Sequence, residues 1–135
     1  MKRVLLLLCA AVLLFTVTAC NPQEQPEESV TSESISGITF VYEKEGAGGD
    51  FSIRIHEDGT FFYSEGTYSS YIGVGAWTLE GDTLTLTDDE NVSYGLVNRF
   101  KVVGGDLIYF SEGSTNFLYV KAADGEKFFA KQEKA

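Results

Sequence analysis

Apolar and polar residues alternate with a period of two along most of this chain, and that pattern is typical of strands with one buried face. The clearest examples lie at 51–56, 83–87 and 94–102, the last with Asn98 as the one polar residue on its apolar face. Other segments are apolar on both faces and are expected to be central strands or strands under a loop: 38–42, 61–63, 107–110 and 117–120. No stretch between them shows a convincing helical period.

Aspartate next to glycine marks the breaks between these segments, at 57–60, 80–83, 104–106 and 124–125. Glycine beside aspartate supplies the positive φ that tight hairpin turns need. Neighbours in sequence are therefore expected to pair antiparallel. The prediction is an all-β domain, an antiparallel up-and-down meander of about eight strands. We expect it to close into a small barrel, because closure removes the exposed sheet edges.

Two glycines stand on one face of a predicted strand. Gly73 and Gly75 share that face with Trp77 and Leu79. Glycine at such positions leaves room for a ring, permits a sharp bend at a barrel corner, or lets a ligand approach the backbone. The two structural explanations are favoured over the ligand.

The first twenty residues carry an export signal. Residues 1–3 are positively charged at Lys2 and Arg3, and residues 4–17 are almost wholly apolar, a run too short for a membrane-spanning helix of roughly 20 residues. The motif Val17-Thr18-Ala19-Cys20 resembles the lipobox of bacterial lipoproteins. The resemblance implies removal of residues 1–19, a lipid such as palmitate on Cys20, and anchoring on the extracytoplasmic face of the cell membrane. The alternatives are an ordinary signal peptide followed by a chance cysteine, or an uncleaved anchor.

Residues 20–37 are predicted to be the lipidated cysteine and a disordered tether, since the segment is rich in Glu, Ser, Gln and Pro and cannot bury enough surface to offset its ordering entropy. The 17 residues after Cys20 could span at most roughly 56–61 Å when extended. The competing interpretation is that the segment packs on the domain. We expect no core residue before Ile38, so residues 38–135 are predicted to form one domain that folds alone. Cys9 and Cys20 are the only cysteines, so that domain has no internal disulfide.

A second resemblance concerns the domain itself. Residues 57–61 read Glu-Asp-Gly-Thr-Phe, and residues 75–86 follow the pattern G-x-W-x-L-x-G-D-x-L-x-L. These phrases resemble the lipocalin-like small lipoproteins of bacteria, among them copper-resistance and stress lipoproteins of the NlpE type. The resemblance covers roughly residues 38–120 and implies a lipocalin-like barrel. It implies no copper or redox activity, because the C-x-x-C motif of the copper-linked members is absent.

Charge excludes several classes of partner. The chain has 20 acidic and 10 basic side chains, and without Lys2 and Arg3 its net charge is −12. A chain with this negative charge is not expected to bind nucleic acid. It is also not expected to adhere to an anionic lipid surface, except through the lipid on Cys20.

Catalytic and metal-binding motifs are missing from the sequence. His56 is the only histidine, and no G-x-S-x-G phrase accompanies it, so a hydrolytic triad is not expected. The acidic run 88–91 lacks the spacing of a calcium-binding EF-hand loop and is expected to be solvated. We predict a protein that is not an enzyme and that has no cofactor and no metal site.

The candidate contact residues are Tyr63, Tyr68, Tyr71, Trp77 and Asn98. Tyr68 and Tyr71 flank two serines beside the glycine-rich strand. Their rings could form a recognition surface at the barrel mouth or fold inward as a plug over the core, and the plug is favoured. Asn98 could point into the barrel toward a ligand, or it could be a hydrogen-bonded core amide or mark a bulge, and these last two explanations are favoured.

Two functions fit these features. We favour a non-catalytic module that binds a small apolar or peptidic ligand in the barrel or at its mouth. The alternative is a protein-interaction module, such as an inhibitor or sensor of an envelope enzyme. An open apolar cavity would support the first function, and a filled barrel with exposed aromatic side chains would support the second.

Overall fold

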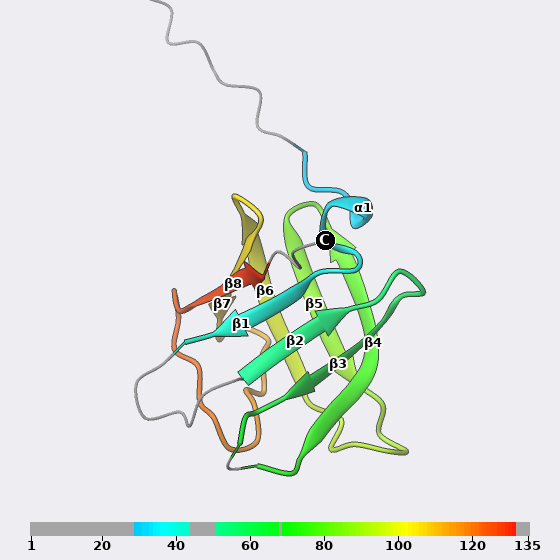
Figure 1. Ribbon diagram of the computed structural model, residues 1–135, viewed down its shortest axis with the longest axis vertical. Coiled ribbons are helices and arrows are strands. Elements are labelled where there is room, and N and C mark those ends of the chain that lie inside the picture. The colour runs from blue at the N-terminus through cyan, green and yellow to red at the C-terminus, as the bar shows by residue number, and fades with distance from the viewer. Residues whose placement is uncertain (1–28, 44–50, 68, 132–135) are drawn as a thin grey trace, which may run out of the picture.

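A computed structural model describes residues 29–43, 51–67 and 69–131 of the chain. Its strands each pair antiparallel with the next in sequence, and the last pairs with the first, so that the sheet closes into a barrel (Figure 1). They are β1 (Thr39–Tyr42), β2 (Phe51–Ile55), β3 (Thr60–Ser64), β4 (Ile72–Glu80), β5 (Thr83–Asp88), β6 (Val97–Val103), β7 (Asp106–Phe110) and β8 (Lys127–Lys131). The predicted all-β meander of about eight strands is confirmed.

The period of two sets which side chains enter the barrel. In β5, Leu84 and Leu86 are buried, while Thr83, Thr85 and Thr87, which alternate with them, lie on the outer face. The register places Leu84 opposite Phe100 and Leu86 opposite Asn98 on β6. The same alternation buries Phe51, Ile53 and Ile55 of β2. Each strand therefore contributes every second side chain to one shared core.

Aromatic rings fill much of the interior. The ring of Phe117 has its centroid 4.8 Å from that of Phe51, 5.0 Å from Tyr63 and 5.9 Å from Phe128. Phe100 and Tyr109 lie next to it at 6.3 Å and 6.2 Å. Because the rings around Phe117 come from β2, β3, β6, β7 and β8, they meet across the interior and leave that part of it filled by side chains.

The segment 117–120 is not a strand, so that part of the prediction was wrong. It belongs to the long connection between β7 and β8. Asn116 has a positive φ of 71° there, and its side-chain oxygen accepts hydrogen bonds from the backbone N–H groups of Phe117 and Ala122. The Asn116 side chain thereby closes a local loop, and its hydrogen bonds replace those that a neighbouring strand would make to this backbone. The apolar character of the segment reflects the burial of Phe117 in the core.

The end of the predicted tether is structured, contrary to expectation. Residues Ser32–Ile35 form a single helical turn, α1, and Thr31 and Ser34 exchange the reciprocal hydrogen bonds of a capping box. Ile35 is fully buried, and Val30 packs against the same core. The expectation that no core residue precedes Ile38 was therefore wrong. Residues 20–28 of the predicted tether lie outside the described residues, as does the predicted signal.

The two ends of the barrel differ in their connections. Short turns join β2 to β3, β4 to β5 and β6 to β7 at one end, where α1 also lies (Figure 1). The opposite end, called here the loop end, carries the β3–β4, β5–β6 and β7–β8 connections, which span residues 65–71, 89–96 and 111–126. Among the described residues, no helix is long and apolar enough to cross a membrane.

Candidate functional site

A buried carboxylate lies at the loop end of the barrel. Asp88 is the last residue of β5 and is only 3% exposed. Its Oδ2 accepts hydrogen bonds from the hydroxyls of Tyr63 at 3.2 Å, Tyr71 at 2.9 Å and Ser93 at 2.8 Å. Four segments are joined here, namely β3, the β3–β4 loop, β5 and the β5–β6 loop. The expectation that the acidic run 88–91 is wholly solvated was wrong for Asp88.

Two of the predicted contact residues meet at this carboxylate. Tyr63 is fully buried, and the half-buried ring of Tyr71 packs against it with a centroid distance of 6.0 Å. Burial, with the Asp88 charge as the second cause, raises the pKa of Tyr63 well above its ordinary value of 10.0. The described geometry of Tyr71 matches an inward plug. Tyr68 lies outside the described residues.

The glycines of β4 make room for this arrangement. A Cβ on Gly73 would lie 2.2 Å from ring carbons of Tyr63, and a Cβ on Gly75 would lie 2.0 Å from the backbone oxygen of Thr87. The first glycine leaves space for a ring, and the second allows β4 and β5 to approach closely. The explanation that glycine leaves room for a ring therefore holds for Gly73, while Gly75 permits a close approach of backbone rather than of a ligand.

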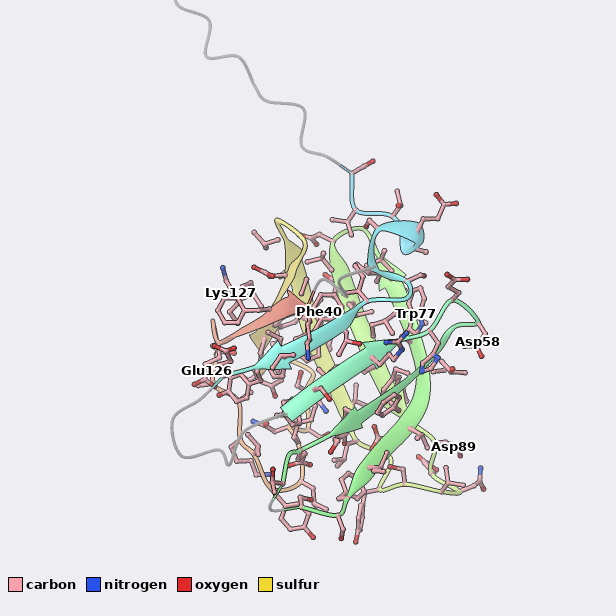
Figure 2. All side chains as sticks on the ribbon, viewed as in Figure 1. Phe40, Asp58, Trp77, Asp89, Glu126 and Lys127 are labelled. Atoms are coloured by element: carbon pink, nitrogen blue, oxygen red, sulfur yellow. The ribbon has the colours of Figure 1, made fainter. Side chains whose placement is uncertain are left out.

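Trp77 does not join the tyrosines. Its indole N–H donates to the backbone oxygen of His56 at 2.9 Å, and its backbone N–H donates to Gly59 at 2.9 Å. Figure 2 shows it near Asp58 in the β2–β3 turn, whereas Asp89 marks the opposite end. Trp77 is half-buried and packs against the core. Its hydrogen bonds connect β4 to the β2–β3 turn at the α1 end of the barrel.

Asn98 points into the barrel, as the sequence suggested, but it is not a hydrogen-bonded amide within the described chain. It is 1% exposed, and neither its Oδ1 nor its Nδ2 has a partner there. The same holds for Oδ1 of Asp88, whereas Tyr109, which is also 1% exposed, has a side-chain hydrogen bond with Ser114. Burial raises the pKa of Tyr109. These three side chains come from the consecutive strands β5, β6 and β7.

Two exposed tyrosines project from the loop end. Tyr94 in the β5–β6 loop is 67% exposed, and Tyr119 in the β7–β8 loop is 65% exposed. The predicted strand 94–102 begins only at Val97, so Tyr94 lies in the loop before it. Ile72 and Val92 are also exposed on this side of the molecule. We call Ile72, Val92, Tyr94 and Tyr119 the exposed apolar set.

Both tyrosines sit on backbone that is held in place. The backbone N–H of Tyr94 donates to the hydroxyl of Tyr71, and the two rings lie 5.2 Å apart. The β7–β8 loop is fixed by Glu65, which is 1% exposed and accepts hydrogen bonds from three consecutive backbone N–H groups at 2.6–2.8 Å, those of Leu118, Tyr119 and Val120. The rings are therefore presented on ordered backbone.

Other polar side chains form hydrogen bonds within turns or lie on the outer face of the barrel. Hydrogen bonds from Thr60 lower the pKa of Asp58. The pKa of Asp82 is lowered by a hydrogen bond from Lys101, and that of Asp89 by hydrogen bonds from Asn91. The ring of His56 lies against Phe62 on the outside. Across the described ranges, no three His, Cys, Asp or Glu side chains gather in a metal-binding arrangement.

Sequence reasoning missed Asp88, Glu65, Tyr109 and both exposed tyrosines. A signal was present for Asp88, because it is in phase with the buried Leu84 and Leu86. No local signal marks Glu65, whose partners lie 53 to 55 positions away in sequence.

Comparisons of the chain with models of protein families, with curated proteins and with solved structures give no match.

Proposed function

We propose that this protein is a lipid-anchored, non-catalytic interaction module that contacts another envelope protein through the loop end of its barrel. The observation that carries the proposal is the exposed apolar set, which lies at the start of β4 and on two loops, with its two tyrosines on backbone that Tyr71 and Glu65 hold in place. Tyrosines are enriched among the residues that dominate binding energy, and ordered loops lose little conformational entropy on binding.

The position of α1 supports an orientation in which the loop end of the barrel faces away from the membrane. The described chain enters the barrel through α1, at the end opposite the long loops (Figure 1). With the lipid on Cys20, only eight residues separate the anchor from Ser29, and they reach at most roughly 26–29 Å when extended. So short a connection holds the α1 end near the membrane and leaves the loop end to face away from it.

A small apolar ligand inside the barrel, the function favoured from the sequence, receives less support. The rings of Phe51, Tyr63, Phe117 and Phe128 already occupy the centre of the interior. A ligand there would have to displace a packed side chain, at a cost comparable to a disruptive core substitution. A filled barrel with exposed aromatic side chains is the arrangement that favours a protein partner.

Site-specific photo-crosslinking in cells tests the proposal. A photoreactive residue at Tyr94 or Tyr119 is expected to give the same discrete protein adduct, and one at Thr78, which is exposed on the outer face of β4, is expected to give none. Adducts should be lost when the other tyrosine is changed to alanine. Equal adducts from all three positions, or none from either tyrosine, would overturn the proposal.

The anchor is tested separately. Cys20→Ser is expected to abolish incorporation of a radiolabelled fatty acid, because serine lacks the thiol that carries the lipid. Label retained on the Cys20→Ser protein would refute the lipid anchor and leave the proposed contact surface untouched.

A further inference from the structure

Two exposed acidic side chains border the exposed apolar set. Asp89 and Glu90 open the β5–β6 loop, and Val92 and Tyr94 of that set follow in the same loop. The backbone oxygen of Asp89 accepts hydrogen bonds from the N–H groups of Val92 and Ser93 at 3.1 Å and 2.8 Å, so the chain turns tightly here. This turn holds the two acids beside the apolar side chains of the loop.

Local contacts fix both acids. Figure 2 shows Asp89 at the loop end, where its Oδ1 accepts hydrogen bonds from the backbone and the side chain of Asn91, both at 2.9 Å. The Glu90 side chain lies against Gly95, where an added Cβ would come within 2.9 Å of Glu90 Cγ. Gly95 directly follows Tyr94, so the Glu90 side chain lies beside the backbone that carries this exposed ring.

The charge of these two acids is not neutralised within the part of the chain that the structure describes, since neither acid forms an ion pair there. Two bases reach the β7–β8 loop and donate to its backbone oxygens. Lys121 donates to Phe117, and Arg99 donates to Glu112 at 3.2 Å. The three long loops together have six acidic side chains and one basic side chain. The loop end therefore offers unpaired negative charge next to exposed apolar side chains.

This combination favours a basic partner. Charges at the border of an interface select partners of opposite charge, and like charges brought together oppose binding. A second copy of this chain would bring the same carboxylates and, without Lys2 and Arg3, a net charge of −12. Lysine and arginine side chains also bind to the faces of tyrosine rings, which the exposed apolar set supplies.

We infer, on the basis of the proposed function, that the protein partner of the loop end presents an apolar surface bordered by lysine and arginine side chains. In the complex the exposed apolar set packs on the apolar part of that surface. The basic side chains of the partner pair with Asp89 and Glu90 at its border.

Removing the two charges tests the chemistry of the partner. Asp89→Asn with Glu90→Gln keeps the size of both side chains and the oxygen that accepts from Asn91. The full chain, with the photoreactive residue at Tyr119, is crosslinked in isolated membranes at about 0.05 M NaCl. Removal of the charges is expected to lower the yield of the protein adduct roughly fivefold or more.

The control variant removes the same charge at the opposite end of the barrel. It combines Glu57→Gln with Asp58→Asn in the β2–β3 turn. Asp58 is a close match for Asp89, because its Oδ1 accepts hydrogen bonds from the backbone and the side chain of Thr60 at 2.9 Å and 2.6 Å. The control is expected to give the same adduct yield as the parent protein.

Salt distinguishes charge pairing from damage to the surface. Raising NaCl to about 0.5 M is expected to lower the yield of the parent protein toward that of the neutralised variant, because salt screens exposed charges. Equal yields from the neutralised and control variants, or a parent yield that does not fall with salt, would overturn the basic partner and leave the proposed contact intact. Absence of any adduct from the parent protein would instead overturn the proposed function.

Discussion

At the scale of single residues, the loop end is organised by two acidic side chains that act as hydrogen-bond acceptors. Asp88 gathers three hydroxyls, and Glu65 gathers three backbone N–H groups. Hydrogen bonds to a charged acceptor are stronger than neutral ones, which offsets part of the cost of burying the carboxylate. Each acid thereby joins parts of the chain that are distant in sequence.

The close approach of Gly73 to Tyr63 predicts the effect of adding one methyl group. Gly73→Ala is expected to destabilise the fold by about 1–3 kcal/mol, because the new Cβ overlaps the Tyr63 ring and forces it out of its packed position. Urea unfolding measures the change. Thr78→Ala on the exposed outer face of the same strand is the control and is expected to stay within about 0.5 kcal/mol. Equal stabilities for the two variants would contradict this account of the glycine.

Glu65 predicts a second residue-scale effect. Glu65→Gln is expected to cost about 1–3 kcal/mol, because an amide has one acceptor oxygen and its NH₂ group would face a backbone N–H donor. Hydrogen exchange at the backbone N–H groups of Leu118, Tyr119 and Val120 should accelerate together. Glu112→Gln, an exposed acid on the same loop, is the control and should leave those rates unchanged. Exchange that is unaltered in Glu65→Gln would show that the loop is held by other contacts.

At the scale of elements, α1 belongs to the barrel domain although its sequence resembles a tether. The turn has only four residues, too few to be stable alone. Its stability comes from the capping box of Thr31 and Ser34 and from the burial of Ile35 against the core. The domain therefore starts before Ile38, and a chain beginning at Ile38 would lack part of its core.

The burial of Ile35 predicts the result of shortening its side chain. Ile35→Ala in the full chain is expected to lower the free energy of unfolding by about 2–5 kcal/mol, the usual cost of removing a large aliphatic side chain from a core. Glu33→Ala, on the exposed side of the same turn, tests whether the turn itself or the core contact is responsible. If Glu33→Ala were as damaging as Ile35→Ala, the core contact would not explain the loss.

At the scale of the whole molecule, an aromatic core stabilises a small domain that has no disulfide. Phe117 from the β7–β8 loop completes this core from the loop end, and Ile35 belongs to the same cluster. The shared core links the folding of the barrel to the order of its loops. Tyrosines inside this core also make the stability depend on pH.

The buried tyrosine predicts a loss of stability in alkali. The pKa of Tyr63 is raised in the folded state, so its full contribution is present below its ordinary pKa of 10.0 and is lost as pH rises above it. Above pH 10 the unfolded chain releases this proton and the folded chain keeps it, which costs about 1.4 kcal/mol per pH unit. Urea midpoints measured between pH 8 and pH 11 should fall, and less steeply in Tyr63→Phe. An identical slope in both proteins would count against a buried, protonated Tyr63.

The sequence by itself determined the barrel, its meander order and its tight turns, because these depend on local alternation and on aspartate–glycine pairs that act over a few residues. It also indicated that Tyr71 lies at one end of the barrel, and it offered an inward-pointing Asn98 as one possibility. Only the tertiary structure decided that Asp88 is a buried acceptor, that 117–120 crosses the barrel end as a loop, and that Ile35 joins the core. Each of these depends on partners far away in sequence. The phase of Asp88 with Leu84 and Leu86 indicates burial but does not reveal the hydroxyls that pair with it, and a residue outside a periodic strand does not reveal which distant surface will cover it.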